Sequence, residues 1–221
     1  MTEMGILYTA EMDLPDADIE AFVNWYAFRH AADLYQVGFK VCTCYRAVEG
    51  DMNILDLYEA PSPDVFTSPE YRRMMPKDPY AAELMVRRRN KAHTVYSQRY
   101  AAAQPDCETR VLNADWITLL RFAASEADEE KVAEFIASDE APRLFGIGAK
   151  RVRLAHRTTD HPTNSTFRPR CLLVVEWPER PPEQATPTKR LGDSLGSAFS
   201  KMDIFVGYRV YPWPDRKLSS L

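Results

Sequence analysis

The stretch DADIEAFVNWYAFRHAADLYQVGF, residues 16–39, decides the fold of this chain. Its apolar side chains recur three and four residues apart, the pattern of one helix face, and they are Ile19, Phe22, Val23 and Tyr26. His30 continues this spacing, and Gly38 ends the helix in a turn that leads into a strand. The helix face that should pack against the core therefore ends in an imidazole ring.

The same stretch recurs at an offset of 110 residues. Val37-Gly38 aligns with Ile147-Gly148, and Glu140 stands where the first copy has His30. Segments before and after this stretch align in order at the same offset. The chain is therefore predicted to contain two copies of one unit.

Each copy is predicted to run strand, helix, strand, strand, helix, strand, which is the ferredoxin-like β-α-β-β-α-β order. The first copy spans residues 1–102, with strands expected at 5–13, 39–46, 53–60 and 92–100 and helices at 16–37, 69–75 and 80–91. A linker at 103–114 leads to the second copy, residues 115–215, with strands expected at 115–123, 148–157, 170–177 and 203–211 and helices at 126–142 and 188–201.

The strands are apolar on both faces, as in Leu55 and Leu57 against Ile54 and Tyr58. Helices would cover one face of each four-stranded sheet, so the other apolar face must be buried against another layer. Two copies in one chain can pack these bare faces together. The predicted fold is therefore α+β, with tandem ferredoxin-like repeats that form an intrachain dimeric α/β barrel.

Five short motifs resemble the EthD-like members of the dimeric α/β barrel superfamily, over roughly residues 5–100. They are WYAFRH at Trp25, VGF at Val37, YRAVEG at Tyr45, LDLYEA at Leu55 and SPEYRR at Ser68. The W-Y-x-x-x-H element is the most specific, and the second half lacks it. The superfamily includes cofactor-free isomerases, cyclases, decarboxylases and lyases, cofactor-free oxygenases, and haem enzymes with two copies, so the resemblance implies a small-molecule site but leaves its reaction open.

The helix supplies four candidate site residues. We predict His30 as a catalytic acid or base, because an imidazole can move a proton near neutral pH without a metal. Tyr26, one turn earlier, is predicted to orient a substrate oxygen as a second catalytic residue. Arg29 and Trp25 lie on the flank, where Arg29 could bind a carboxylate or phenolate. The alternatives are a structural histidine, a core tyrosine and a surface salt bridge.

Further candidates come from the strands and from the second copy. Four strand tyrosines are candidates for a substrate-binding wall, with core packing as the alternative: Tyr8, Tyr45, Tyr58 and Tyr96. Glu140 is a candidate for a second pocket and is expected to close its helix, because Pro142 follows. His156 and His161 flank a long hairpin loop that could fold over a pocket mouth.

Composition narrows the classes of partner. The net charge of −4 is too small for a nucleic-acid surface. No apolar run reaches the roughly 18 residues of a membrane span, and the N-terminus lacks the features of a signal peptide. Cys42 and Cys44 are interpreted as small buried hydrophobes in a reducing cytoplasm. The histidines show no metal-ligand spacing, so no metal and no cofactor are expected.

The sequence thus predicts a cytoplasmic protein with a small-molecule substrate, and it leaves a homodimeric state open. The favoured hypothesis is a cofactor-independent lyase, decarboxylase or isomerase that uses His30 on a small apolar substrate, with an aromatic compound preferred. A non-catalytic small-molecule-binding protein and a cofactor-free oxygenase are the alternatives.

Overall fold

The first copy forms the elements expected of it. In the computed structural model, residues 4–74, 79–107, 112–158, 161–165, 168–185, 188–196 and 200–212 are described. The strands are β1 (Ile6–Asp13), β2 (Val41–Glu49), β3 (Ile54–Ala60) and β4 (Arg89–Ala103). The helices are α1 (Asp16–Trp25), α2 (Ala31–Gln36), α3 (Pro69–Met74) and α4 (Pro79–Arg87), and a π-helical turn (Tyr26–His30) joins α1 to α2.

The second copy repeats this order. Its strands are β5 (Trp116–Ala123), β6 (Arg151–Arg157), β7 (Cys171–Trp177) and β8 (Ser200–Tyr211). Its helices are α5 (Glu129–Phe135), α6 (Ala141–Gly146) and α7 (Thr188–Leu195), and a second π-helical turn (Ile136–Glu140) joins α5 to α6. None of the helices in the described part of the chain is long and apolar enough to cross a membrane.

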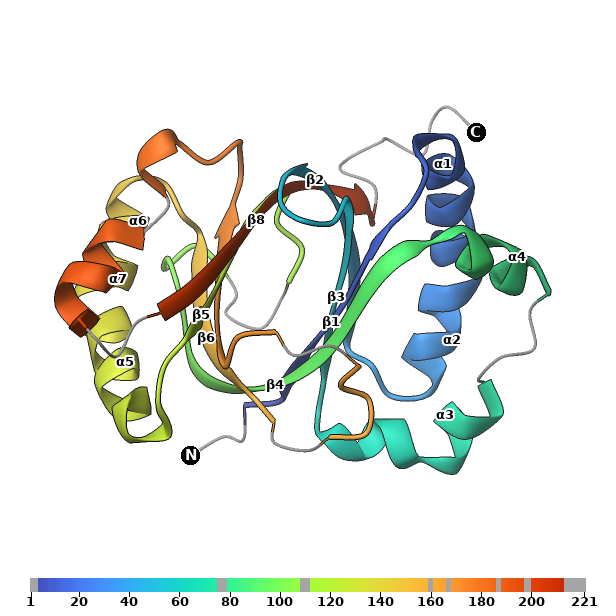
Figure 1. The fold of residues 1–221 in the computed structure, drawn as a ribbon, viewed down its shortest axis with the longest axis horizontal. Helices are drawn as coiled ribbons and strands as arrows, with labels where there is room; N and C mark the ends of the chain where they lie inside the picture. The colour runs from blue at the N-terminus through green and yellow to red at the C-terminus, as the bar shows by residue number, and fades with distance from the viewer. Residues whose placement is uncertain are drawn as a thin grey trace.

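The eight strands close into one barrel in the order β1-β3-β2-β8-β5-β7-β6-β4. Strands β2 and β8 pair at one seam between the copies, and β4 and β6 pair at the other. The helices of the first copy cover one outer wall and those of the second copy cover the opposite wall (Figure 1). The predicted α+β fold, two ferredoxin-like repeats in an intrachain barrel, is confirmed.

The duplication is visible in the backbone. Both π-helical turns, and the glycine turns that follow them, lie 110 residues apart. Gly38 has φ = 104° and Gly148 has φ = 105°, a conformation that glycine adopts without strain. The Phe39 N–H donates to the Leu34 carbonyl at 3.1 Å, and the Ala149 N–H donates to the Leu144 carbonyl at 3.0 Å.

Burial on both faces explains why the strands are apolar throughout. Side chains on the outer face pack under the helices, and those on the inner face fill the barrel. The inner cluster is drawn from both copies and includes Leu7, Leu55, Leu57, Ile117, Leu119, Leu172, Val174 and Phe205. Neither sheet could bury this face alone, so the two copies form one core.

A buried ion pair joins the two copies inside the barrel. Arg121 donates to Glu11 at 2.5 Å, and both side chains are at most 1% exposed. These residues are 110 positions apart, so each is the counterpart of the other. Arg121 also bonds Asp203 at 2.5 Å, and Arg168 donates to Glu11 at 2.8 Å. Burial raises the pKa of Glu11, and the two guanidinium groups oppose that rise.

Two local expectations were wrong. The helix of the second copy does not close at Glu140. It continues as α6, because Pro142 lies in the first turn, where its missing N–H costs little. The predicted helix at 80–91 ends earlier, and β4 begins at Arg89. Helix propensity alone could not predict where α4 ends and β4 begins, because pairing between β1 and β4 extends the strand back to Arg89.

We expect Arg121→Met to lower the free energy of unfolding by about 3 kcal/mol, because it removes one of the two cations beside the buried Glu11 carboxyl. Denaturant unfolding measures the change. Arg46→Met is the matched control. The Arg46–Asp16 pair is exposed, with side chains 39% and 84% accessible, and should contribute less than about 1 kcal/mol. Equal losses in the two variants would contradict a structural role for the buried pair.

Candidate functional site

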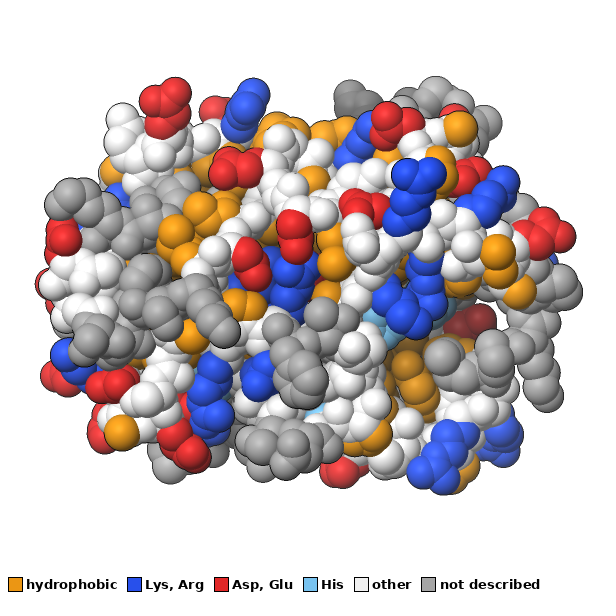
Figure 2. Space-filling model, in the orientation of Figure 1, with side chains coloured by type: hydrophobic (Ala, Val, Ile, Leu, Met, Phe, Trp, Pro, Cys, Tyr) orange, Lys and Arg blue, Asp and Glu red, His pale blue; other side chains and the backbone are white. Residues whose placement is uncertain are grey.

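A cavity of about 390 Å³ lies between the helices and the sheet of the first copy. Five of the predicted site residues line it, and they are Tyr8, Trp25, Arg29, His30 and Tyr58. Apolar side chains form most of the remaining wall, among them Met12, Phe22, Leu34 and Met85. Figure 2 shows a hollow on the side of α3 and α4, with histidine, basic and apolar side chains around it. The wall is mainly apolar, with a few polar groups among the apolar side chains, as in most small-molecule sites.

The π-helical turn sets the position of His30. The Ala31 N–H bonds the Tyr26 carbonyl five residues back, so the turn contains one residue more than an α-helical turn. The buried face therefore passes from Tyr26 to Ala31 and Leu34 rather than to His30. The helical spacing predicted His30 on the core face. The structure places it beside that face, where its ring borders the cavity.

Aromatic rings surround the His30 imidazole. It stacks on Trp25 with ring centroids 4.7 Å apart and an interplanar angle of 18°, and its centroid lies 6.5 Å from that of Tyr58. Burial lowers the pKa of His30 to about 4, because the apolar surroundings disfavour the imidazolium. His30 is therefore neutral at pH 7 and can accept a proton.

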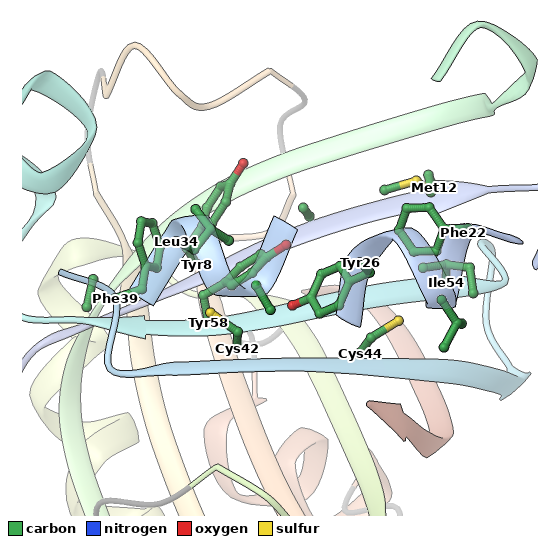
Figure 3. Packing of buried hydrophobic residues seen from close by; sticks show 14 of the residues in the cluster. Tyr8, Met12, Phe22, Tyr26, Leu34, Phe39, Cys42, Cys44, Ile54 and Tyr58 are labelled. Atoms are coloured by element: carbon green, nitrogen blue, oxygen red, sulfur yellow. The ribbon is translucent and has the colours of Figure 1, made fainter. Parts of the chain in front are cut away.

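Tyr26 supports the cavity without lining it. The ring is fully buried, and its hydroxyl donates to the Thr43 carbonyl at 3.4 Å. Its centroid is 6.2 Å from that of Tyr58, and Figure 3 shows the two hydroxyl groups extending toward each other. Burial raises the pKa of Tyr26 well above its usual value, so it stays protonated. The structure does not bring Tyr26 to the wall where it was expected to hold a substrate oxygen.

Tyr45 and Tyr96 lie on the other face of the sheet. Both belong to the cluster inside the barrel, and the Tyr45 hydroxyl donates to the Ala114 carbonyl at 3.2 Å. Their expected place in the cavity wall is therefore wrong. Of the four strand tyrosines, Tyr8 and Tyr58 point under the helices, because alternate residues of a strand face opposite sides.

Several polar residues of this cavity were not predicted from the sequence, and two of them, Asp56 and His93, lie on strands of the sheet. The Tyr8 hydroxyl lies 3.1 Å from Nδ1 of His93, whose pKa burial lowers to about 4. Asp56 is 2% exposed, and desolvation raises its pKa to about 8. A signal for Asp56 was available in the sequence, because it is the one acidic residue within the apolar run ILDLY of β3.

In the second copy, Glu140 is held in ion pairs. The carboxylate is fully buried and accepts from Arg143 Nε at 2.9 Å and from Arg190 Nε at 3.3 Å. These contacts tie α6 to α7 over a packed layer that includes Trp177 and Leu191. Glu140 is thus part of an ion-pair cluster between these helices, and its role at a second pocket stays a prediction.

The long hairpin loop between β6 and β7 packs along β4. The Ser165 N–H donates to the His93 carbonyl at 3.1 Å. His161 packs edge-on against Phe66 at 5.3 Å, and the buried His156 lies 2.9 Å from Glu129. Neither histidine lines the cavity, so their predicted association with its mouth is not supported.

Among the residues that the structure describes, no three His, Cys, Asp or Glu side chains form a group that could hold a metal ion. Three of the four cysteines are buried free thiols, namely Cys42, Cys44 and Cys171. Burial raises the pKa of each of them, so they stay protonated at neutral pH.

The fold has relatives among solved structures. No family model and no curated protein sequence matches this chain. An anthrone oxidase-like protein superposes with a TM-score of 0.66 at 7% identity, over 95% of this chain and 92% of that one. A protein from Lactobacillus acidophilus NCFM, provisionally described as a monooxygenase, gives 0.59 at 8% identity over 94% of each chain. A heme-binding protein from Thermus thermophilus superposes with a TM-score of 0.52 at 10% identity, over 94% of this chain and 91% of that one. These similarities show that the chain has the dimeric α/β barrel fold.

Acid should destabilise the protein through His30. The pKa of His30 is about 4 in the folded protein and about 6.5 in the unfolded chain. Between these pH values the unfolded chain binds more protons than the folded protein, so the free energy of unfolding falls as the pH falls. His30→Gln removes this effect. Between pH 7 and pH 5 the variant should therefore gain about 2 kcal/mol relative to the wild type in denaturant unfolding. A difference that does not change with pH would show that His30 is not buried in its neutral form.

Proposed function

We propose that this protein is a cofactor-independent enzyme with an EthD-like first half, and that it catalyses a lyase, decarboxylase or isomerase reaction on a small aromatic substrate. The observation that carries this proposal is the position of His30, a neutral imidazole stacked on Trp25 at the wall of a mainly apolar cavity. A ring in this state can take a proton from a bound substrate and return it to another atom.

The remaining wall suits such a reaction. Aromatic side chains exclude water, so the charge that develops on the substrate interacts more strongly with nearby polar groups. Arg29 also lines the cavity, and its guanidinium would favour a carboxylate or phenolate on the substrate. After His30 removes a proton from the substrate, return of that proton to a different carbon completes an isomerisation. Loss of carbon dioxide, followed by protonation of the carbanion, completes a decarboxylation.

A cofactor-free oxygenase is the second candidate. The descriptions of the structural neighbours, an anthrone oxidase-like protein and a provisional monooxygenase, favour it. The first step would be the same, because removal of a proton from an activated aromatic compound gives an anion that dioxygen can oxidise. Oxygen uptake separates the candidates, since an isomerase or lyase consumes none.

Isotope exchange tests the proton transfer before the natural substrate is known. In D₂O, an enzyme that removes a C–H proton exchanges it for deuterium, and NMR detects the exchange in a panel of aromatic ketones and hydroxy-aromatic acids. We expect His30→Gln to slow exchange by about 10²–10⁴-fold, the usual share of a general base. Affinity for the same compounds should change far less. A non-catalytic binding protein would show binding without exchange.

His156→Gln is the control for that experiment. It makes the same change at a buried histidine that lies beside Glu129, away from the cavity. Exchange should continue at the wild-type rate in this variant. Similar rates in the wild type and in His30→Gln would exclude His30 as the proton carrier.

We also expect purified protein to show no Soret band and no stoichiometric transition metal after dialysis, because an imidazole can move a proton without either. Absorption spectroscopy and elemental analysis measure both. A Soret band that survives dialysis would replace this proposal with a haem enzyme.

A further inference from the structure

Asp56 lies opposite the helices on β3, which runs between β1 and β2 in the sheet. Its carboxyl lines the same cavity as His30 and is 2% exposed. One oxygen, Oδ1, has no hydrogen-bond partner among the described residues. A buried polar atom without a partner costs about 1–3 kcal/mol, so its retention calls for an explanation.

The other buried acidic side chains of the described chain are paired with arginine. Glu11 pairs with Arg121, Glu140 with Arg143, and Glu176 accepts from Arg153 at 3.2 Å. Such partners keep a buried carboxylate charged. Asp56 instead faces the cavity, which contains space for a ligand.

The groups around Asp56 are mostly neutral at pH 7. The Cys44 thiol and the Tyr58 hydroxyl bond the carboxyl and oppose the rise in its pKa, which desolvation nevertheless brings to about 8. Other neutral groups near the carboxyl or along the cavity are Tyr8, Tyr26, Cys42, His30 and His93, whose pKa values burial shifts toward the uncharged form. The charged groups of the lining are Arg29, Asp33 and Arg88.

We propose that Asp56 is a catalytic acid of this cavity, which donates a hydrogen bond to a substrate carbonyl oxygen while His30 removes a proton from the neighbouring carbon. The substrate class is therefore an enolisable aromatic ketone or its phenol tautomer. This proposal rests on the proposed function and adds the group that holds the oxygen, a role that Tyr26 cannot fill from its position against Thr43.

The step balances without a cofactor. The C–H bond breaks, its proton passes to His30, and its electron pair forms a carbon–carbon double bond. The electron pair of the carbonyl π bond moves to oxygen, which takes the proton of Asp56. In a substrate with a double bond conjugated to the enol, the imidazolium then protonates the far carbon of that double bond, the double bond shifts by one position, and Asp56 recovers its proton as the carbonyl forms again. The product is an isomer of the substrate, and both side chains end in their starting states.

Binding of 2,4-dinitrophenol tests the donor role. This compound remains an anion across the pH range used and resembles the enolate. With Asp56 protonated, the anion accepts its hydrogen bond; above about pH 8, ionised Asp56 repels it. We expect the wild-type affinity, measured by quenching of Trp fluorescence, to fall about tenfold for each pH unit above 8. An affinity independent of pH would overturn the proposal.

Variants of Asp56 sharpen this test. Asp56→Asn keeps a donor and cannot ionise, so its affinity should stay constant above pH 8. Asp56→Leu removes the donor and should weaken binding about 10–100-fold at pH 7, the range for a hydrogen bond to a charged group. Glu59→Gln is the control, because it makes the same change as Asp56→Asn on the same strand. It should retain the wild-type profile. If Asp56→Leu does not fold, the pH dependence of dinitrophenol affinity in the wild type and in Asp56→Asn is enough to test the donor role.

Deuterium exchange separates this proposal from the proposed function. Asp56→Asn should exchange more slowly than the wild type, by about tenfold or more, with the binding of ketones little changed. Exchange that depends on His30 but is unaffected in Asp56→Asn would overturn the role of Asp56 and leave the proposed function intact. An absence of exchange from the whole panel, with the dinitrophenol profile as expected, would overturn catalysis and leave Asp56 as a ligand donor.

Discussion

The ion pair between Glu11 and Arg121 crosses the interior of the barrel and joins positions that the duplication makes equivalent. In a barrel made of two identical chains, these positions would carry the same residue and the same charge, and like charges would repel in a medium of low dielectric. In one chain the two copies can differ, and here they carry opposite charges. The closed barrel, with helices on both outer walls, depends on this complementary interior.

The same divergence separates the roles of the two helix–sheet layers. Both copies keep the π-helical turn, so residue 30 and residue 140 follow equivalent backbone paths. In the first copy this position carries a neutral imidazole beside a cavity; in the second it carries a carboxylate tied to Arg143 and Arg190. The backbone therefore places a side chain at the same point in both copies, and the neighbouring residues decide whether that side chain borders a cavity or is held in ion pairs.

The fold could be predicted from the sequence because local patterns determine its elements. These patterns are the helical spacing from Ile19 to Tyr26, the glycine turns, and strands that are apolar on both faces. The site could be predicted only in part. His30, Trp25 and Arg29 belong to one helix, so a motif could find them. The π-helical turn that moves His30 off the core face has no such pattern. Asp56 and His93 reach the cavity from separate strands, and only the folded sheet brings them together.

The loop between β6 and β7 belongs to the second copy and does not line the cavity, but it contacts a strand that does. Its backbone and Asn164 bond β4 at His93 and Val95, and thus brace one wall of the first copy. A barrel assembled from separate chains loses such a brace on dilution. Here the brace is tethered, and its effective concentration is set by the linker instead of by the amount of protein in solution. The contacts between this loop and β4 therefore do not depend on the concentration of the protein.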